Sequence, residues 1–237
     1  MSIALDVFRT AKSAHVLARP LAPSVIAGGA GDETREFQQI GMTLHFGRNE
    51  TIFSEGDEAK YSYKVVSGVI RLCKHMVDGR RQIADFVQPG NYCGLLNLGE
   101  HRFTAEAVGE VTVVAYPQRQ MESLGEKTPA LRKWMTGFLT RSLMGMQDHV
   151  VMLGRQTAKE RVVSFLLMLA ERAGAVEGDA IGLPMNRQDI ADYLGLTIET
   201  VCRVLSDLKR SRVIELPNLH QAVLTDMEAL QDIADGE

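Results

Sequence analysis

The sequence predicts an α+β protein, and three patterns carry that prediction. Residues 42–116 alternate between apolar and polar side chains in short segments separated by glycine turns, which is typical of an antiparallel β-roll or barrel. From residue 128 the apolar spacing becomes helical, which predicts one long helix. Residues 185–210 have the pattern of two short helices joined by a tight turn, and a hairpin wing is predicted after them. The expected order is a β-roll, a long helix and a winged helix-turn-helix.

The predicted strands of the roll are short and end at turn signals. They cover residues 43–46, 51–53, 61–66, 69–73, 82–87 and 111–116. Asp78 and Gly79 form a strong hairpin signal between two of them, because glycine accepts the positive φ that a tight turn requires. Cys73 occupies an alternating strand position and is expected in the core.

Four segments are expected along the chain. With 237 residues and 45% hydrophobic content, the chain is long enough for two modest cores. Pro20, Pro23 and the glycine-rich run at 27–32 indicate a flexible extension at the start. The expected segments are residues 1–35 for this extension, 36–127 for the β-roll, 128–154 for the long helix and 155–237 for the winged helix-turn-helix domain.

Charge and cysteine usage limit the partners and the location. The formal net charge is -4, so attraction to nucleic acid must come from a local basic group rather than from the whole molecule. Such a group surrounds the second short helix and consists of Arg203, Lys209, Arg210 and Arg212. The three cysteines are too widely spaced for a disulfide framework or a metal site, which predicts a reducing cytoplasm and no metal. Neither a membrane span nor a signal-peptide pattern is found, so we expect a cytoplasmic protein without a membrane partner.

The long helix carries an apolar seam on one side. The seam residues repeat at spacings of four, three, four and three, and they are Leu139, Leu143, Met146, Val150 and Leu153. This heptad pattern predicts a parallel coiled-coil homodimer. The alternative is a helix that packs only on its own β-roll. Trp134, Phe138, Val151 and Met152 lie off the seam, so the helix has apolar surface for both the roll and a second chain.

The two short helices have signals for their ends. Asn186 is the expected cap of the first helix, and Gly195 ends it where a left-handed residue costs least. Thr197 is the expected cap of the second helix. The buried stripe of that helix follows helical spacing and consists of Ile198, Val201, Leu205 and Leu208.

A polar face of the second helix is the candidate DNA-binding surface. The residues of this face are Glu199, Cys202, Arg203 and Ser206. A carboxylate there accepts a hydrogen bond from cytosine N4, and a guanidinium bridges guanine O6 and N7. Glu199 lies four residues before Arg203 and can also orient its guanidinium. Thr197, Thr200 and Arg187 are further expected DNA contacts. An ordinary helical hairpin with a surface ion pair is the alternative interpretation.

The helix pair resembles that of a known family. Residues 189–197 (DIADYLGLT) and 199–203 (ETVCR) are similar to the helix-turn-helix of the CRP/FNR family of bacterial transcription regulators, and most similar to its FNR/FixK branch. That branch has Glu, two intervening residues and Ser-Arg, whereas here Cys202 replaces the Ser. The resemblance extends over about residues 38–226 and includes the cyclic-nucleotide-binding β-roll.

The resemblance implies a function. It implies a homodimer that binds double-stranded DNA at a TTGAT…ATCAA-like palindrome, with two recognition helices about 34 Å apart. It also implies activation through RNA polymerase and, for the FixK-like branch, regulation of nitrogen fixation or microaerobic genes. One activating loop of the family corresponds to Asp78, Gly79, Arg80 and Arg81, which the resemblance implies as a polymerase contact.

The family's cofactor signatures are incomplete in this chain. The cysteines that hold the iron–sulfur cluster of FNR are missing, and Val114 occupies the place of the central one. In the cyclic-nucleotide cassette, Leu95 stands where a Glu binds the ribose, and Phe103 where an Arg binds the phosphate, unless Arg102 turns inward. The haem-binding pair would need a His at Leu95, two residues after Cys93. We expect no cofactor; a regulator gated by a cyclic nucleotide or haem is the alternative.

Cys202 suggests a redox control. A thiol between Glu199 and Arg203 on the DNA-binding face would lose its fit when oxidised. The alternative is a small side chain that merely replaces the Ser.

An enzyme with Cys93 or Cys202 as nucleophile is not expected, because neither has a His and an acid nearby in sequence. The remaining alternative is a protein-binding module that does not bind DNA. The two can be distinguished by salt, because the affinity of a DNA-binding protein for DNA falls steeply as the salt concentration rises.

Overall fold

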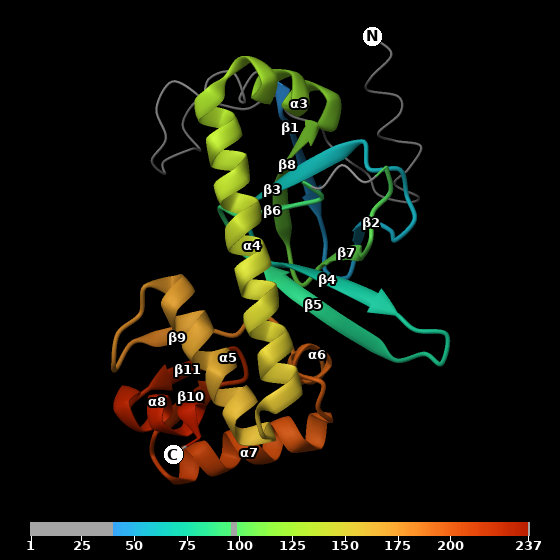
Figure 1. Cartoon of the computed structure of the whole chain (residues 1–237). Coiled ribbons are helices and arrows are strands. Elements are labelled where there is room, and N and C mark those ends of the chain that lie inside the picture. Colours follow the sequence, from blue (N-terminus) through green and yellow to red (C-terminus); the bar gives the residue numbers. More distant parts are fainter. Residues whose placement is uncertain (1–39, 96–98, 237) are drawn as a thin grey trace. The chain divides into compact units, whose positions relative to one another are not determined.

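The computed structural model describes residues 40–95 and 99–236 and forms two compact units (Figure 1). One unit ends at Leu139 and the other begins at Thr140. The predicted α+β fold class is confirmed, whereas the extension expected at residues 1–35 lies outside the described residues. None of the helices within 40–95 and 99–236 has both the length and the apolar character that crossing a membrane requires.

The first unit is a β-roll of two four-stranded sheets. One sheet has the order β1 (Met42–Phe46), β8 (Val111–Pro117), β3 (Tyr61–Ser67) and β6 (Tyr92–Cys93). The other has the order β2 (Thr51–Phe53), β7 (Thr104–Ala107), β4 (Ile70–His75) and β5 (Arg81–Val87). The paired strands are antiparallel, and alternate residues of both sheets face a shared apolar core. Fully buried members of that core include Val65, Ile70, Ala105 and Val113.

The roll agrees with the prediction except at two strands. All six predicted strands are present, and Gly79 has a φ of 84° in the hairpin between β4 and β5. Strands β6 and β7 were not predicted. They are two and four residues long, and such short strands show too little alternation to be detected. Their stability comes from pairing with β3 and β4 rather than from local sequence.

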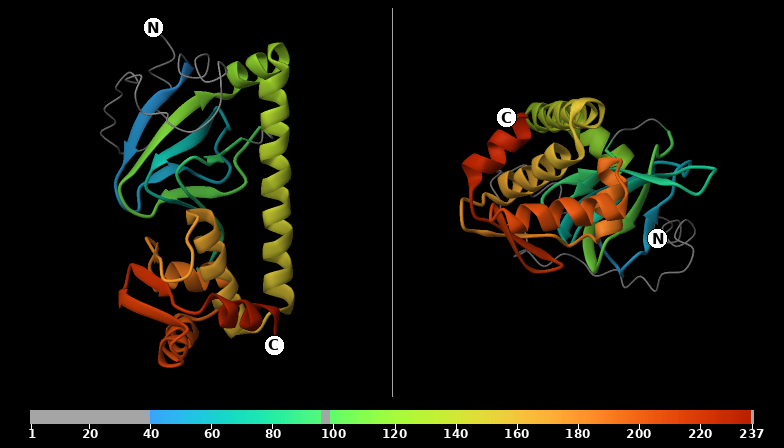
Figure 2. Two further views of the ribbon diagram at one scale, coloured as in Figure 1. Left: turned by 90° about the vertical axis from the view of Figure 1, so that its left-hand side faces the viewer. Right: turned by 90° about the horizontal axis from the view of Figure 1, so that it is seen from below.

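Two helices follow the roll. Helix α3 (Gln118–Lys127) was not predicted, and its Met121 is fully buried against the roll. Thr128 interrupts the helical path in an extended conformation before Pro129, as expected for a residue that precedes proline. Helix α4 (Pro129–Arg155) then runs without a break (Figure 2). The predicted long helix is confirmed, with its start at proline.

The second unit is a winged helix-turn-helix. Its helices are α5 (Ala158–Ala173), α6 (Arg187–Leu194), α7 (Ile198–Arg210) and α8 (Met227–Asp235). Its sheet has the order β10 (Ile214–Asn218), β11 (Gln221–Leu224) and β9 (Ala180–Gly182). The predicted hairpin wing is formed by β10 and β11, and Asn218 pairs with Gln221 across a turn at Leu219 and His220. Strand β9, which was not predicted, pairs with β11 and extends the sheet.

Candidate nucleic-acid interface

Three local interactions fix the α6–turn–α7 motif. Asn186 Oδ1 accepts a hydrogen bond of 2.8 Å from the Asp189 backbone N–H and caps α6. Gly195 ends α6 in the left-handed conformation with a φ of 62°. Thr197 Oγ1 accepts from the Thr200 backbone N–H at 3.3 Å and caps α7. The three predicted helix-end signals are thus confirmed, and they set the sharp turn between the helices.

Helix α7 has a buried side and an exposed polar side. Three predicted stripe residues, Val201, Leu205 and Leu208, are buried, while Ile198 at the helix start is half-buried. The side chains at the polar positions are exposed, and they are Glu199, Cys202, Arg203 and Ser206. This arrangement places a carboxylate, a thiol, a guanidinium and a hydroxyl on one accessible surface of a rigid helix. Such a set contains both donors and acceptors for base edges.

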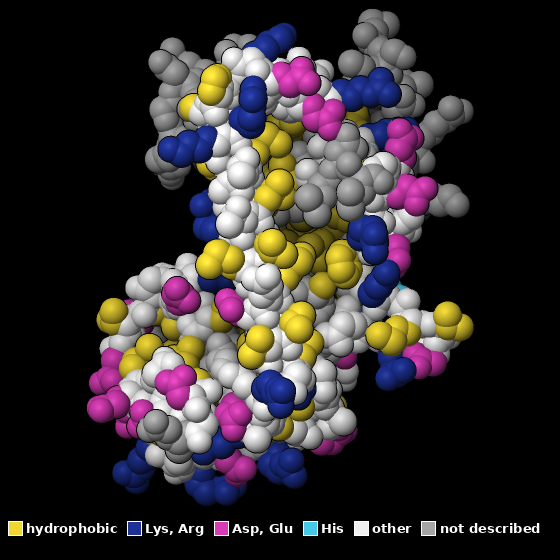
Figure 3. Space-filling model, in the orientation of Figure 1, with side chains coloured by type: hydrophobic (Ala, Val, Ile, Leu, Met, Phe, Trp, Pro, Cys, Tyr) yellow, Lys and Arg dark blue, Asp and Glu magenta, His cyan; other side chains and the backbone are white. Residues whose placement is uncertain are grey.

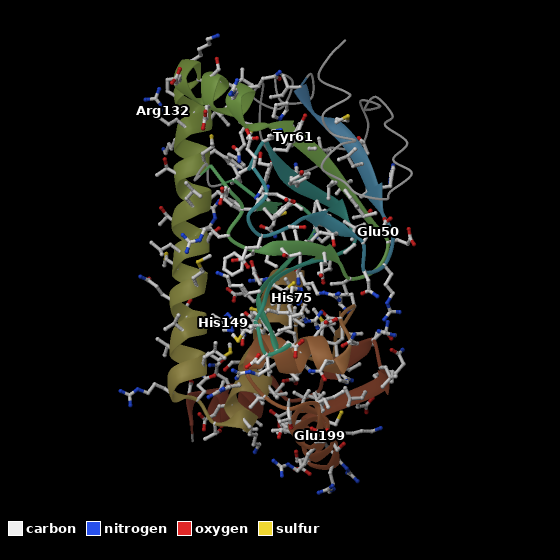
Figure 4. The ribbon with its side chains drawn as sticks, turned by 90° about the vertical axis from the view of Figure 1, so that its right-hand side faces the viewer. Glu50, Tyr61, His75, Arg132, His149 and Glu199 are labelled. Atoms are coloured by element: carbon white, nitrogen blue, oxygen red, sulfur yellow. The ribbon has the colours of Figure 1, made fainter. Side chains whose placement is uncertain are left out.

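The Glu199 carboxylate is held at the beginning of α7 (Figure 4). Hydrogen bonds from its own backbone N–H and from the Thr197 side chain lower the pKa of Glu199, so the group stays ionised at neutral pH. Within the parts of the chain that are described, no ion pair joins Glu199 to Arg203. In the free protein the carboxylate instead accepts from the Thr197 side chain, and orientation of the Arg203 guanidinium by Glu199 stays a prediction for the DNA complex.

Arg187 of α6 interacts electrostatically with Cys202 of α7. Burial lowers the pKa of the half-buried Arg187 guanidinium, and the nearby Cys202 raises it by a smaller amount. Arg187 Nη1 is buried and lacks a hydrogen-bond partner among the described residues. The Ser206 hydroxyl donates to the Cys202 backbone carbonyl at 2.8 Å. The Arg187 guanidinium of the preceding helix thus interacts electrostatically with the Cys202 thiol on this side of α7.

The sequence interpretation did not assign a role to Arg161, although it holds the motif in place. From α5, its Nε donates to the Gln156 carbonyl at 2.9 Å and its Nη2 to the Leu153 carbonyl at 2.8 Å. Its Nη1 donates to the Leu194 carbonyl at 3.0 Å. One guanidinium therefore satisfies carbonyls at the carboxyl ends of both α4 and α6. These contacts fix the helix-turn-helix against the last turns of α4.

A second contact between α4 and α6 involves His149 (Figure 4). Its Nε2 donates to the Tyr193 carbonyl at 3.0 Å, and the His149 and Tyr193 rings stack with centroids 4.1 Å apart. Arg161 falls within the span of the family resemblance, but no local pattern in the sequence indicated its contacts. No signal indicated His149, because its partner lies 44 residues along the chain.

Arg161→Ala is expected to lower the free energy of unfolding by about 2–3 kcal/mol, because three carbonyls lose a charged donor together. Arg161→Lys is expected to recover little of this, since one ammonium cannot reproduce the planar fork. Chemical denaturation of the full chain measures the loss. Lys159→Ala on an exposed position of the same helix is the control and should be nearly neutral. Equal effects of the two alanine variants would show that Arg161 has no special structural role.

Stacked aromatic rings occupy part of the interior of the roll. The His101 ring stacks on Phe53 at 3.7 Å between centroids, and Phe53 stacks on Tyr63 at 5.5 Å. His101 is buried, and this burial lowers its pKa, so the imidazole is neutral at pH 7. Arg102, the nearest cation to the expected phosphate position, is exposed rather than turned inward. Among the described residues 99–105, therefore, none turns a cation inward towards the expected phosphate position.

Cys93 is unsuited to act as a haem ligand or as a nucleophile. It is buried, and burial raises the pKa of its thiol to about 12. Asp85 adds to this increase. A thiol in this state is neither an effective nucleophile nor a ready haem ligand, and Leu95 stands where the haem pair needs a His. Cys93 is a core residue of the roll.

The seam predicted on α4 is largely uncovered in the single chain. Leu143, Met146 and Val150 are 56%, 52% and 69% exposed, whereas Leu139 and Leu153 are half-buried. Hydrophobic side chains are visible along α4 in Figure 3. Other α4 residues contact the roll, since the Trp134 and Phe138 rings lie 5.0 and 5.8 Å from the ring of Tyr92. A chain without a partner therefore leaves a strip of large apolar side chains in water.

The predicted polymerase loop is only partly exposed. Asp78 and Arg80 lie at the tip of the β4–β5 hairpin and form an ion pair of 2.8 Å with each other. Gly79 provides the turn between them. Arg81 begins β5, is largely covered, and its Nη1 lies 4.0 Å from Glu106 Oε2. Of the four residues, Arg81 thus faces the roll rather than the tip.

Comparisons with known proteins agree with this organisation. Residues 43–128 match the Cyclic nucleotide-binding domain, and residues 160–233 match the Crp-like helix-turn-helix domain. Nitrogen fixation regulation protein FixK of Bradyrhizobium diazoefficiens is 45% identical over 186 residues, which are 78% of each chain. Transcriptional activatory protein AadR of Rhodopseudomonas palustris is 38% identical over 202 residues, 84% of each chain.

A solved structure gives the same result for the fold. The structure of FixK2 from Bradyrhizobium japonicum matches with a TM-score of 0.78 and 36% identity, over 81% of this chain and 96% of that one. The match covers both domains, and a sequence identity of 36% supports membership of the same family as well as a shared fold. The chain belongs to the CRP/FNR family of DNA-binding transcription regulators, and its relatives at 45% and 36% identity are FixK proteins.

Proposed function

We propose that the chain acts as a homodimer that binds a TTGAT…ATCAA-like palindrome through α7 and mainly activates transcription. The observation that carries the proposal is the exposed set Glu199, Cys202 and Arg203 on the first turns of a firmly capped helix. A recognition helix enters the major groove by its N-terminal end, so these side chains would meet the bases first. By analogy with the FixK relatives, the regulated genes would serve nitrogen fixation or microaerobic growth.

Each exposed side chain has a proposed role. Glu199 would accept from cytosine N4, and Arg203 would donate to guanine O6 and N7 of a C·G pair. Thr197 and Thr200, whose hydroxyls lie 3.2 Å apart at the start of α7, would contact phosphates together with the free backbone N–H groups. Ser206 would extend the contact surface by one turn, and Arg187 would add a cation beside it.

The dimer is proposed from the exposed seam of α4. Burial of Leu143, Met146 and Val150 against a second copy would remove the apolar strip from water. We retain residues 36–127, 128–154 and 155–237 as the roll, the dimerisation helix and the DNA-binding domain. A two-fold axis along α4 would give each half of a palindrome its own α7. RNA polymerase would contact the exposed tip with Asp78 and Arg80.

We also propose that DNA binding needs no small effector, since the buried, stacked rings of Phe53, Tyr63 and His101 occupy part of the roll interior and Arg102 is exposed. A titration of the purified protein, without added ligand, on the palindrome and on a scrambled duplex tests this. Tight binding to the palindrome alone is expected, with an affinity that falls steeply as salt rises. Salt-independent binding, or equal binding to both duplexes, would contradict sequence-specific DNA recognition.

Cys202 is proposed as the point of redox control. It is exposed on the DNA-binding face, and the Arg187 guanidinium beside it would stabilise an anionic oxidised sulfur. A sulfinate at this position would also repel the DNA phosphates. Oxidation would thus weaken binding both by charge and by bulk.

Peroxide is expected to lower the affinity of the wild-type protein for the palindrome at least about tenfold, because one unfavourable charge at the groove costs roughly 1–3 kcal/mol. Cys202→Ser is expected to bind with unchanged affinity before and after peroxide. Anisotropy titrations of both proteins, with thiol reductant as the reference condition, measure the difference. If the serine variant lost affinity to peroxide as the wild type does, the switch would lie elsewhere.

A further inference from the structure

Strands β4 and β7 bring a thiol, an imidazole and a carboxylate to one point of the roll. Cys73 and His75 lie two residues apart on β4, and Glu106 lies on the adjacent β7. Cys73 Sγ is 3.6 Å from His75 Nε2, and His75 Nε2 is 3.4 Å from Glu106 Oε1. All three atoms lie within 4.8 Å of one another. Figure 4 shows His75 on the roll, and its side chain is 53% exposed.

The separations are those of ligands around one tetrahedral ion. Zinc binds a thiolate at about 2.3 Å and an imidazole or carboxylate at about 2.0–2.2 Å, which places neighbouring ligand atoms roughly 3.3–3.6 Å apart. The two measured separations fall in or near this range without any movement of the backbone. The Cys73–Glu106 edge is within 4.8 Å and requires at most a small side-chain adjustment.

The carboxylate of Glu106 is already oriented for such a role. Its Oε2 accepts from Arg71 Nη2 at 2.7 Å and from Arg71 Nε at 2.8 Å. Its other oxygen, Oε1, points to His75. Arg71 is almost fully buried, so the carboxylate is held with one oxygen committed and one directed at the thiol–imidazole pair. Ligating carboxylates in metal sites are commonly fixed by hydrogen bonds of this kind.

We propose that Cys73, His75 and Glu106 form a binding site for a divalent transition-metal ion such as Zn²⁺, with a fourth coordination position open to water beside His75. Thiolate, imidazole and carboxylate are all zinc ligands, and three protein ligands with one open position is a known arrangement. Binding replaces the Cys73 S–H proton by the metal, and the proton is released to solvent. This site is separate from α7 and does not depend on the proposed DNA contacts.

The surroundings predict a moderate affinity. Cys73 is fully buried and its thiol donates to the Thr104 carbonyl at 3.6 Å, so a metal ion must displace that proton. The Arg71 and Arg81 guanidiniums lie near the site, each in an ion pair with Glu106. The two guanidiniums also repel a dication, which favours an exchangeable ion over a permanent one.

Co²⁺ is the probe for this site, because a bound thiolate gives it an intense near-ultraviolet charge-transfer band. The experiment uses the full chain with Cys202→Ser, so that the exposed thiol cannot contribute. We expect one Co²⁺ per chain, displaceable by Zn²⁺. Cys73→Ser is expected to remove the charge-transfer band, and His75→Ala to weaken Co²⁺ binding at least about tenfold.

His45→Ala is the matched control, since His45 is also an exposed histidine on a strand of the roll. It should leave Co²⁺ binding unchanged. His75 is exposed, so its alanine variant decides the question even if Cys73→Ser fails to fold. Absence of the thiolate band at saturating Co²⁺ would overturn the proposal, and so would a band of equal affinity in the His75→Ala and His45→Ala proteins.

Discussion

Replacement of both Met146 and Val150 by aspartate is expected to convert the protein to a monomer and to lower its affinity for the palindrome at least about 100-fold, since two linked half-site contacts become one. Both side chains are more than half exposed in the single chain, so the substitutions should not unfold it. In a dimer they would bury four carboxylates in an apolar seam, and each buried charge costs several kcal/mol. Sedimentation and DNA titration measure the two effects.

Arg141→Asp is the matched control for this pair. Successive helical residues advance by about 100°, so residue 141 lies on roughly the opposite side of α4 from the seam. Arg141 is exposed and receives the same carboxylate. It should leave a dimer with nearly normal affinity. A double variant that stays dimeric would show that the seam on α4 is not the dimer interface.

Arg203→Ala is expected to weaken binding to the palindrome by roughly 1–3 kcal/mol and to relax the choice of base at one position in each half-site. The loss has this size because one bidentate contact to guanine disappears, while the phosphate contacts remain. Titrations on the palindrome and on variants with each C·G pair exchanged measure both effects. The affinity of the variant for scrambled DNA should fall much less than its affinity for the palindrome.

Arg210→Ala separates base recognition from general charge. Arg210 lies at the other end of α7, is exposed, and forms an ion pair of 3.1 Å with Asp207. Removal of this side chain should reduce the affinity for both duplexes by a similar small factor. It should also make the affinity slightly less dependent on the salt concentration. If Arg203→Ala behaved in the same way, Arg203 would be a phosphate contact and not a base contact.

The parts of the fold that depend on local chemistry were predictable from the sequence. The helix ends at Asn186, Gly195 and Thr197 follow from hydrogen bonds and dihedral angles within a few residues, and all three are found. The hairpin at Asp78 and Gly79 is equally local. The exposed polar face of α7 followed from helical periodicity alone.

The features that the sequence did not reveal depend on distant pairing or on competition. Cys73 was expected in the core from its alternating strand position and is buried there, but its closeness to Glu106 was not predicted, because β7 is too short to show alternation. Arg161 was missed because its acceptors are backbone carbonyls, which have no sequence signature. The Glu199–Arg203 pair was expected from spacing, but the cap at Thr197 holds the carboxylate instead. The spacing of residues along a helix predicts which side chains can come into contact, but not which of several competing contacts forms.

Hydroxyl-radical footprinting on the TTGAT…ATCAA duplex, without added effector, tests the central proposal most directly. Two α7 helices of one dimer in successive major grooves predict two protected regions on one face of the DNA, about 10 base pairs apart. Both regions should disappear together with Met146→Asp/Val150→Asp, as expected for one cooperative dimer. A single protected half-site, or protection of scrambled DNA to the same extent, would contradict a dimer that recognises its sequence through α7.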